Sequence, residues 1–179
     1  MDIELKELTE VDLELVRKWR NSDDVANHMY TDSHITSEDQ IKWFHQLNKE
    51  TTRYWLIMYN GRKLGLAYVT EISRSLNSCY WGFYLGDSST RGAGIGAKVE
   101  FNVLEYVFNH LGLNKLRCEV FVHNYRVVKM HEKFGFRREA YYREHCVKGN
   151  EKLDVVGLAI LKNEWKLLRD FQKARIYGK

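Results

Sequence analysis

The stretch Arg91-Gly92-Ala93-Gly94-Ile95-Gly96 is the part of this sequence that says most about its fold. An apolar, aromatic-rich run over 79–85 precedes it and predicts a strand, while apolar positions at helical spacing follow it over 95–111. Glycines permit a tight turn, and the first amides of a helix have no partner within that helix. This strand-loop-helix junction therefore predicts a phosphate site, with a tight turn that binds nothing as the plain alternative.

The same loop partly fits a second phosphate-binding pattern. Gly92-x-Gly94-x-x-Ala97 matches the dinucleotide fingerprint, and Glu119 lies near the position of its ribose-binding acid. However, Glu119 falls inside the predicted strand 116–122 and not at its carboxyl end. Too few residues follow Asn124 for the remaining β-α-β units of that fold. We therefore disfavour a dinucleotide-binding fold.

On either side of the loop, apolar residues recur at every second position in some segments, which is typical of strands, and about every 3.6 positions in others, which is typical of helices. Asn60-Gly61 and Gly149-Asn150 each separate two strand-like runs and predict hairpins. Thr9 with Asp12, and Thr36 or Ser37, predict helix starts. Strands are expected over 3–5, 54–59, 64–72, 79–85, 116–122, 137–148 and 153–160, and helices over 11–20, 24–30, 37–47, 95–111 and 125–133. The order predicts an α/β (α+β) fold with mostly antiparallel strands and at least one β-α-β crossover.

Composition narrows the class of protein. The chain has 179 residues, of which 44% are hydrophobic, and it lacks a linker, so we expect one domain over residues 1–179 and no extensive disorder. The apolar runs are too short for a membrane span, and residues 1–20 resemble no targeting peptide, which predicts a cytoplasmic protein. Three cysteines without CxxC spacing and seven dispersed histidines predict neither disulfides nor a metal site.

Charge is unevenly distributed along the chain. Residues 1–90 carry 10 basic and 14 acidic side chains, whereas residues 91–179 carry 18 basic and 10 acidic ones. A basic second half suggests an anionic partner, such as nucleic acid, a phosphorylated cofactor or an acidic surface. The charge alone leaves these three partners open, together with a solvated basic face that binds nothing, although the sequence contains no nucleic-acid-binding signature.

Read as Arg91-x-x-Gly94-x-Gly96, the loop resembles the acetyl-CoA signature of the GNAT superfamily of N-acyltransferases. Asn124, Glu132-Lys133 and Gly135-Phe136 resemble the second half of that signature. The resemblance implies a GNAT fold, with a mixed, mostly antiparallel sheet flanked by helices, and acetyl-CoA as cosubstrate without a metal. It also implies that amides at a bulge around 83–85 polarise the thioester carbonyl. The implied cofactor-binding residues are Phe83, Tyr84, Leu85, Arg91, Gly92, Ala93, Gly94, Ile95, Gly96 and Asn124.

A narrower resemblance concerns the acceptor. Trp19-Arg20-Asn21, Asp154 and Glu164-Trp165 are similar to a branch that contains ribosomal-protein N-terminal acetyltransferases and nucleotide-sugar N-acetyltransferases. Within it, Arg20-Asn21, Met29-Tyr30, Trp43-Phe44 and Tyr54-Trp55 look most like the UDP-4-amino-4,6-dideoxy-N-acetyl-β-L-altrosamine N-acetyltransferases of pseudaminic acid biosynthesis, a flagellin-glycosylation pathway. This resemblance implies a nucleotide-sugar substrate and a possible homodimer. Acetylation of a protein N-terminus or a polyamine, and a non-catalytic acyl-CoA sensor, stay open as alternatives.

Acetyl transfer to an amine also requires acid-base groups. Glu119, a charged residue in an apolar strand, is our first candidate for the base, with an ion pair to Arg117 or Lys115 as the alternative. His131 stands where many family members have a tyrosine that protonates the departing thiolate; a water, or a purely structural histidine, is the alternative. His45 and Tyr80 are reserve bases. The expected acceptor-binding residues are Arg20, toward a diphosphate, and Met29, Tyr30, Trp43, Phe44, His45 and Tyr80.

Overall fold

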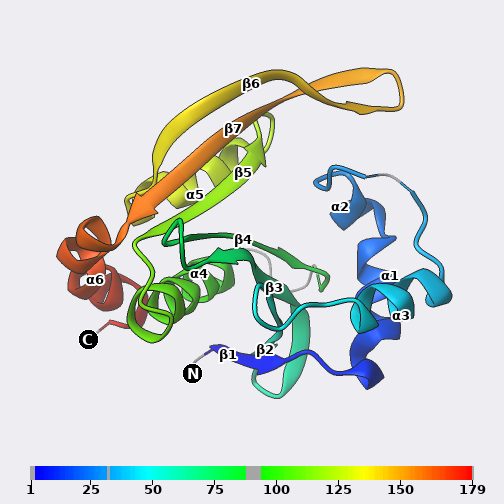
Figure 1. Ribbon diagram of the computed structural model, residues 1–179, viewed down its shortest axis with the longest axis horizontal. Coiled ribbons are helices and arrows are strands. Elements are labelled where there is room, and N and C mark those ends of the chain that lie inside the picture. Colours follow the sequence, from blue (N-terminus) through cyan, green and yellow to red (C-terminus); the bar gives the residue numbers. More distant parts are fainter. Residues whose placement is uncertain (1–2, 32, 88–93, 179) are drawn as a thin grey trace.

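The computed structural model describes residues 3–31, 33–87 and 94–178, and its framework is one seven-stranded sheet (Figure 1). The strand order is β1-β2-β3-β4-β5-β7-β6, and every neighbouring pair is antiparallel except β4 and β5. This confirms the predicted mixed, mostly antiparallel sheet. The strands are β1 (Ile3–Glu7), β2 (Arg53–Tyr59), β3 (Arg62–Ser73), β4 (Ser78–Leu85), β5 (Lys115–Phe121), β6 (Arg137–Lys148) and β7 (Glu151–Leu161).

Helices cover the two faces of the sheet in two groups. Side chains of the first group join a smaller apolar cluster, and those of the second join the main core. The first group comprises a 3₁₀ turn (Glu10–Asp12), α1 (Leu13–Arg20), α2 (Asp23–Ala26) and α3 (Ser37–His45). The second comprises α4 (Ile95–Glu105), which continues as a π turn (Tyr106–His110), α5 (Tyr125–Phe134) and α6 (Lys162–Tyr177). In the part of the chain that the structure describes, no helix is long and apolar enough to cross a membrane.

Both predicted hairpins are present. Asn60 and Gly61 have φ values of 50° and 73°, as a two-residue turn with left-handed residues requires. Gly149 has φ of 57°, and the strand residues on either side of the second turn, Lys148 and Glu151, are paired.

Three helix predictions need correction. The second helix ends at Ala26 and not at Tyr30, which leaves 27–30 as a connecting segment. The third predicted helix, over 37–47, ends at His45, and within it Ile41 is 43% exposed whereas Trp43 and Phe44 pack on the smaller cluster. Helix α6 was not predicted: its Trp165 is buried, but Leu167 is 85% exposed, so its apolar residues do not form one helical stripe.

The strands β4 and β5 separate partway along their length, and this separation creates the site. Their parallel pairing covers only 78–80 with 115–117, although β4 runs on to Leu85 and β5 to Phe121. Beyond Tyr80 the two strands diverge (Figure 1). The gap between them is therefore open to side chains from both faces of the sheet.

The bulge expected around 83–85 in β4 is absent from the pairing with β3. That register is continuous from Gly65–Leu85 to Thr70–Tyr80, and the irregularity lies between Thr70 and Ser73. The backbones of β3 and β4 approach closely at Gly65, where a Cβ atom would lie 2.0 Å from the Tyr84 carbonyl oxygen. Close, continuous pairing with β3 therefore keeps this part of β4 regular.

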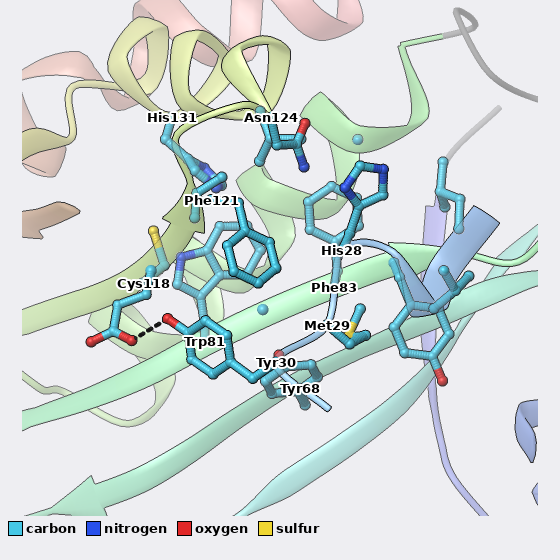
Figure 2. A pocket seen from close by; sticks show the side chains of 18 of the residues that line it. His28, Met29, Tyr30, Tyr68, Trp81, Phe83, Cys118, Phe121, Asn124 and His131 are labelled. Atoms are coloured by element: carbon cyan, nitrogen blue, oxygen red, sulfur yellow. Dashed lines mark hydrogen bonds between the residues drawn. The ribbon is translucent and has the colours of Figure 1, made fainter. Parts of the chain in front are cut away.

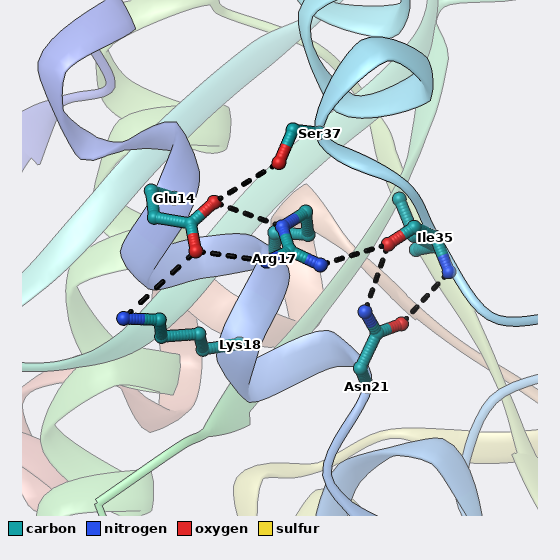
Figure 3. Close-up of polar contacts among 6 residues, drawn as sticks. All are labelled: Glu14, Arg17, Lys18, Asn21, Ile35 and Ser37. Atoms are coloured by element: carbon teal, nitrogen blue, oxygen red, sulfur yellow. Dashed lines mark hydrogen bonds and ion pairs between the residues drawn. The ribbon is translucent and has the colours of Figure 1, made fainter.

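A polar clamp fixes the segment that leads from α2 to α3 (Figure 3). The Asn21 side chain donates to the Ile35 carbonyl at 2.9 Å and accepts from the Ile35 amide at 2.9 Å. Arg17 donates to the same carbonyl at 3.2 Å and is itself paired with Glu14. Asn21 and Ile35 lie on either side of 22–34, so the bonds between them fix the two ends of this segment relative to each other. They thereby help to hold the residues of the segment that face β5.

Candidate active site

The gap between β4 and β5 contains a cavity of about 450 Å³, which we call the central cavity (Figure 2). Alternate residues of β4 and β5 face opposite sides of the sheet. Trp81 and Cys118 belong to the core under α4 and α5, whereas Tyr80 and Glu119 face the side of α1–α3. Two chemically different halves therefore meet in one cavity.

The half beside α5 combines apolar rings with two polar side chains. Trp81 and Phe83 stack with ring centroids 5.7 Å apart. Asn124, the N-cap of α5, and His131 on the same helix line the cavity above them (Figure 2). Sequence reasoning expected Phe83, Asn124 and His131 in the site, and the structure brings them together.

The start of α4 closes this half of the cavity. Gly94 is the N-cap, with φ of 72°, and the first intrahelical bond of the helix runs from the Lys98 amide to the Gly94 carbonyl. The preceding amides of α4 consequently have no intrahelical partner and can bind an anion. A Cβ atom at Gly96 would lie 3.1 Å from Met130 Sδ and 3.3 Å from Phe83 Cζ. Glycine at 96 thus lets the helix approach β4 and α5 closely.

The backbone of β4 offers hydrogen-bonding groups to the gap. The Gly86 amide donates to the Leu64 carbonyl. Since backbone hydrogen bonds to one neighbouring strand occur at every second residue, the backbone groups of residues 80, 82 and 84 also bond to β3. The amides of Trp81, Phe83 and Leu85 then point away from β3, where β5 no longer pairs with them. An extended ligand can take the place of β5 there. By the same alternation the Tyr84 amide faces β3, and its side chain packs in the smaller cluster.

The other half of the cavity is built around a hydrogen bond between distant segments. The Tyr30 hydroxyl donates to Glu119 Oε2 at 2.6 Å, and the Glu119 amide donates to the Tyr80 hydroxyl at 3.3 Å. Burial, reinforced by the Glu119 carboxylate, raises the pKa of Tyr30 far above its usual value, so this phenol stays a hydrogen-bond donor. The Tyr30 ring meets Phe121 edge-on at 5.4 Å and His145 at 5.8 Å.

Glu119 does not form an ion pair with Arg117 or Lys115, which was the alternative to its role as the base. Lys115 pairs with Glu139 at 2.6 Å, and Arg117 pairs with Glu71. The Glu119 carboxylate instead lines the cavity with the Tyr30 hydroxyl on one oxygen. A carboxylate in this position can accept a proton from a ligand on the α1–α3 side.

His131 is held from behind by a second carboxylate. Its Nδ1 lies 2.7 Å from Oε1 of Glu100 on α4, and both side chains are buried. Burial alone lowers the pKa of His131, but Cys118 and Glu100 outweigh that effect and raise it well above its usual value. An imidazole held by a carboxylate in this way can act as an acid in its protonated form.

A second cavity, of about 670 Å³, lies on the other side of α2. Asp24 and Val25 of α2 line the central cavity, whereas Asp23 and Ala26 line the second one. Arg20, predicted to bind a diphosphate, lines the second cavity. Its other described polar and charged lining residues include Asn21, Asn27, Thr31, Ser33, His34, His123, Lys148 and Glu151.

Several predicted site residues lie elsewhere. Trp43 packs edge-on against Tyr54 at 4.9 Å in the smaller cluster, together with Phe44. His45 is at the end of α3, exposed, 3.9 Å from Glu10. The side chain of Ile95 is buried in the main core, whereas its amide is among those at the start of α4. Arg91, Gly92 and Ala93 lie outside the described residues, whereas Met29, Tyr30, Tyr80, Phe83, Tyr84, Leu85, Gly96, Asn124, Glu119 and His131 all line the central cavity.

Sequence reasoning missed other residues of the cavity and one behind it. Tyr68, His28, Phe121 and Cys118 line the cavity, and Glu100 supports His131. The one available signal was Glu100, a charged residue among the apolar positions of the helix that follows the glycine loop. The others come from three separate segments, so only the tertiary fold assembles them.

Comparison with known proteins identifies the family. The acetyltransferase (GNAT) domain model matches residues 2–137. The chain belongs to this family. It is 24% identical over 137 residues to acetyltransferase PseH of Campylobacter jejuni strain 81-176, covering 75% of this chain and 84% of that protein. For PseH of strain NCTC 11168 the identity is 22% over 149 residues, covering 78% and 92%.

Solved GNAT structures share the fold. Spermidine N-acetyltransferase from Vibrio cholerae, in complex with CoA and spermine, superposes with a TM-score of 0.87 at 19% identity, over 92% of this chain and 98% of that one. This likeness confirms the GNAT fold predicted from the loop and the Asn124 segment. The family and its relatives establish the chain as an acetyl-CoA-dependent N-acetyltransferase.

Proposed function

We propose that this enzyme transfers the acetyl group of acetyl-CoA to the 4-amino group of a UDP-amino-sugar, by direct attack of the amine in a ternary complex. The observation that carries the proposal is the two-sided central cavity. Backbone groups of β4 and the start of α4 suit the cofactor on one side, and aromatic side chains with a carboxylate suit an amino-sugar on the other. The pseudaminic acid resemblance and the PseH matches over most of both chains support the same assignment.

Glu119 is the proposed base. An amine enters as an ammonium ion and must lose a proton before it attacks. Glu119 faces the acceptor half, and the Tyr30 hydroxyl on Oε2 orients the carboxylate while Oε1 can accept that proton. Tyr80, a reserve candidate, is unsuited to act as a base, because burial raises the pKa of its phenol well above its usual value.

The cofactor half supplies the remaining groups. The proposed pyrophosphate site is the start of α4 with the 91–96 loop, and Asn124 contacts the pantetheine arm. Amides of β4 that face the gap polarise the thioester carbonyl. His131, on the same side of the sheet, protonates the thiolate as the carbon–sulfur bond breaks, which replaces the tyrosine of many relatives.

The acceptor half suits an acceptor that has a ring better than an extended polycation. Sugar rings pack on aromatic faces, and Tyr30, Tyr68 and Phe121 provide such faces beside Met29. The described lining of the central cavity has two carboxylates and one arginine, which is no large excess of negative charge. The second cavity, across α2, has room and donors for a diphosphate at Arg20.

An acceptor panel tests the proposal. CoA-thiol release from acetyl-CoA would be followed with UDP-4-amino-4,6-dideoxy-N-acetyl-β-L-altrosamine, with spermidine and with a peptide that has an unblocked N-terminus. We expect turnover with the nucleotide sugar and little with the others. Absence of thiol release with the sugar, alongside turnover of either other acceptor, would refute the assignment.

A further inference from the structure

Glu100 and His131 form a pair of titratable side chains buried in the core. The proposed reaction uses His131 but gives Glu100 no role. Glu100 is 0% exposed and His131 is 3% exposed. One Glu100 oxygen is 2.7 Å from His131 Nδ1, and the other, Oε2, has no hydrogen-bond partner among the described residues. Burying a carboxylate with an unsatisfied oxygen is costly, so stability alone does not account for it.

The pair is connected to the central cavity at one end only. His131 lines the cavity, whereas Glu100 lies behind it on α4 and does not. Because Nδ1 is taken by Glu100, Nε2 is the nitrogen left to face other groups. Trp81 and Phe136 enclose the ring, each with its centroid 5.3 Å away, so the imidazole has little freedom to rotate.

Three elements besides α5 place titratable or charged groups against the pair. Cys118 of β5 interacts with His131, and the positive charge of Arg175 on α6 acts on Glu100. From α4 comes Glu100 itself, while β4 contributes only the Trp81 ring. Burial raises the pKa of Glu100, and the His131 charge opposes that rise. The two groups are therefore coupled, so the charge of one alters the titration of the other.

We propose that Glu100 is a positioning residue for acetyl transfer: it anchors His131 Nδ1 and keeps the ring protonated, so that Nε2–H is presented to the departing CoA sulfur. This rests on the proposed function of His131 as the acid. When the carbon–sulfur bond breaks, the sulfur takes the Nε2 proton and leaves a neutral imidazole with its Nδ1–H still on Glu100. Solvent then returns one proton to His131. The nitrogen loses two protons, one from the ammonium before attack and one from the tetrahedral intermediate, and both leave through Glu119 to solvent, so that one proton is released in total.

Nuclear magnetic resonance of ¹⁵N-labelled histidine tests the pairing without any acceptor. In the wild type we expect His131 to keep a proton on Nδ1 and to titrate well above an ordinary histidine. In Glu100→Gln the midpoint should fall by about 1 to 3 pH units, since an adjacent opposite charge is removed. Glu105→Gln, on the same helix but paired with Arg169 at 2.7 Å, is the matched control and should leave the titration unchanged. An unchanged His131 midpoint in folded Glu100→Gln would overturn the inference.

Kinetics separate positioning from mere structural support. Glu100→Gln should lower kcat about 10-fold, with KM for acetyl-CoA little changed, and should move the alkaline fall of kcat to lower pH. In a His131→Tyr background, which restores the common family residue, Glu100→Gln should have almost no effect on kcat. Equal losses in both backgrounds would mean that Glu100 only supports the fold, and would refute a positioning role.

The two assays also separate this inference from the assignment of His131. A shifted titration together with an unaltered kcat–pH profile would contradict the acid role of His131, and with it the catalytic part of the inference. A shifted titration together with a shifted profile supports both. Because the resonance experiment needs no acceptor, a wrong substrate assignment leaves its outcome unaffected.

Discussion

The Tyr30 hydroxyl and Glu119 Oε2 are joined by a 2.6 Å hydrogen bond, although the residues are 89 positions apart in the chain. Tyr30 follows α2, in the segment anchored by Asn21, and Glu119 is on β5 beyond the point where β4 separates from it. The bond thus ties the helical layer to the open part of the sheet. It also places a carboxylate at the acceptor side of the gap.

Replacing this carboxylate should affect catalysis more than cofactor binding. Glu119→Gln keeps the Tyr30 bond but cannot accept a proton, so we expect kcat to fall by about 10² to 10³. The Kd for acetyl-CoA, measured by calorimetry, should change less than about twofold. Glu139→Gln, which alters an exposed carboxylate paired with Lys115, serves as control and should retain activity. A Glu119→Gln enzyme of normal kcat would rule this residue out as the base.

Asn124 is expected to contribute to acetyl-CoA affinity. Its side chain lines the cofactor half, at the start of α5. Asn124→Ala removes about one hydrogen bond, so the Kd for acetyl-CoA should rise about fivefold. Asn114→Ala, at the other end of β5 and exposed, offers the comparison and should bind normally. Equal affinity of both variants would remove Asn124 from the cofactor site.

Gly82 is required by the packing of Tyr68 across the cavity floor. A Cβ atom at 82 would lie 2.3 Å from the Tyr68 hydroxyl and 2.6 Å from its Cζ. We expect Gly82→Ala to lower the free energy of unfolding by about 1–3 kcal/mol, because the tyrosine ring must move. In a Tyr68→Leu background the same change should cost much less, as a double-mutant cycle would reveal. Additive losses would argue against this contact.

Asp12 should make stability dependent on acid pH. It is 3% exposed, receives Lys63 Nζ at 2.6 Å and also accepts from the Thr9 hydroxyl. Burial raises the pKa of Asp12, but Lys63 and Thr9 outweigh it, so the pKa lies below its usual 3.8. Its stabilisation is therefore present above about pH 4 and is lost as the pH falls through the lowered pKa.

Urea unfolding of Asp12→Asn measures this effect. At pH 7 the variant should lose about 2 kcal/mol, the size expected for charged hydrogen bonds that are mostly buried. The difference should shrink as the pH falls below 4. Asp39→Asn removes the equivalent acid of an exposed capping box with Thr36, so its loss should be smaller. A difference between wild type and Asp12→Asn that is independent of pH would contradict the ion-pair explanation.

How much could be predicted from sequence depends on how local each feature is. The two hairpins and the antiparallel strands depend on neighbouring residues, and these predictions were confirmed, as was the GNAT family. Helix α6 was missed because Leu167 and Phe171 are exposed among its few buried apolar residues. Trp43 is predicted at the acceptor but packs in the smaller cluster, because an aromatic run in sequence does not distinguish a packing face from a binding face. His45, a reserve base in the prediction, is exposed beside Glu10.

The residues of the site also divide into those that a local motif predicts and those that only the fold brings together. Asn124 and His131 belong to a motif and were found together in the central cavity. The Tyr30–Glu119 and Glu100–His131 contacts join segments that only the separation of β4 from β5 and the packing of α4 on α5 bring together. No spacing along the chain encodes such contacts. The sequence can mark Glu100 as a charged residue among apolar ones, but only the fold shows that its partner is His131.

A competition experiment tests the central claim most directly. Equal concentrations of UDP-4-amino-4,6-dideoxy-N-acetyl-β-L-altrosamine and spermidine would be supplied with limiting acetyl-CoA, and the acetylated products would be counted by mass spectrometry. Their ratio equals the ratio of kcat/KM values for the two acceptors. We predict that the acetylated nucleotide sugar exceeds acetylspermidine by at least about 100-fold, a difference of roughly 2.7 kcal/mol in transition-state binding. A mixture dominated by acetylspermidine would contradict the proposed function.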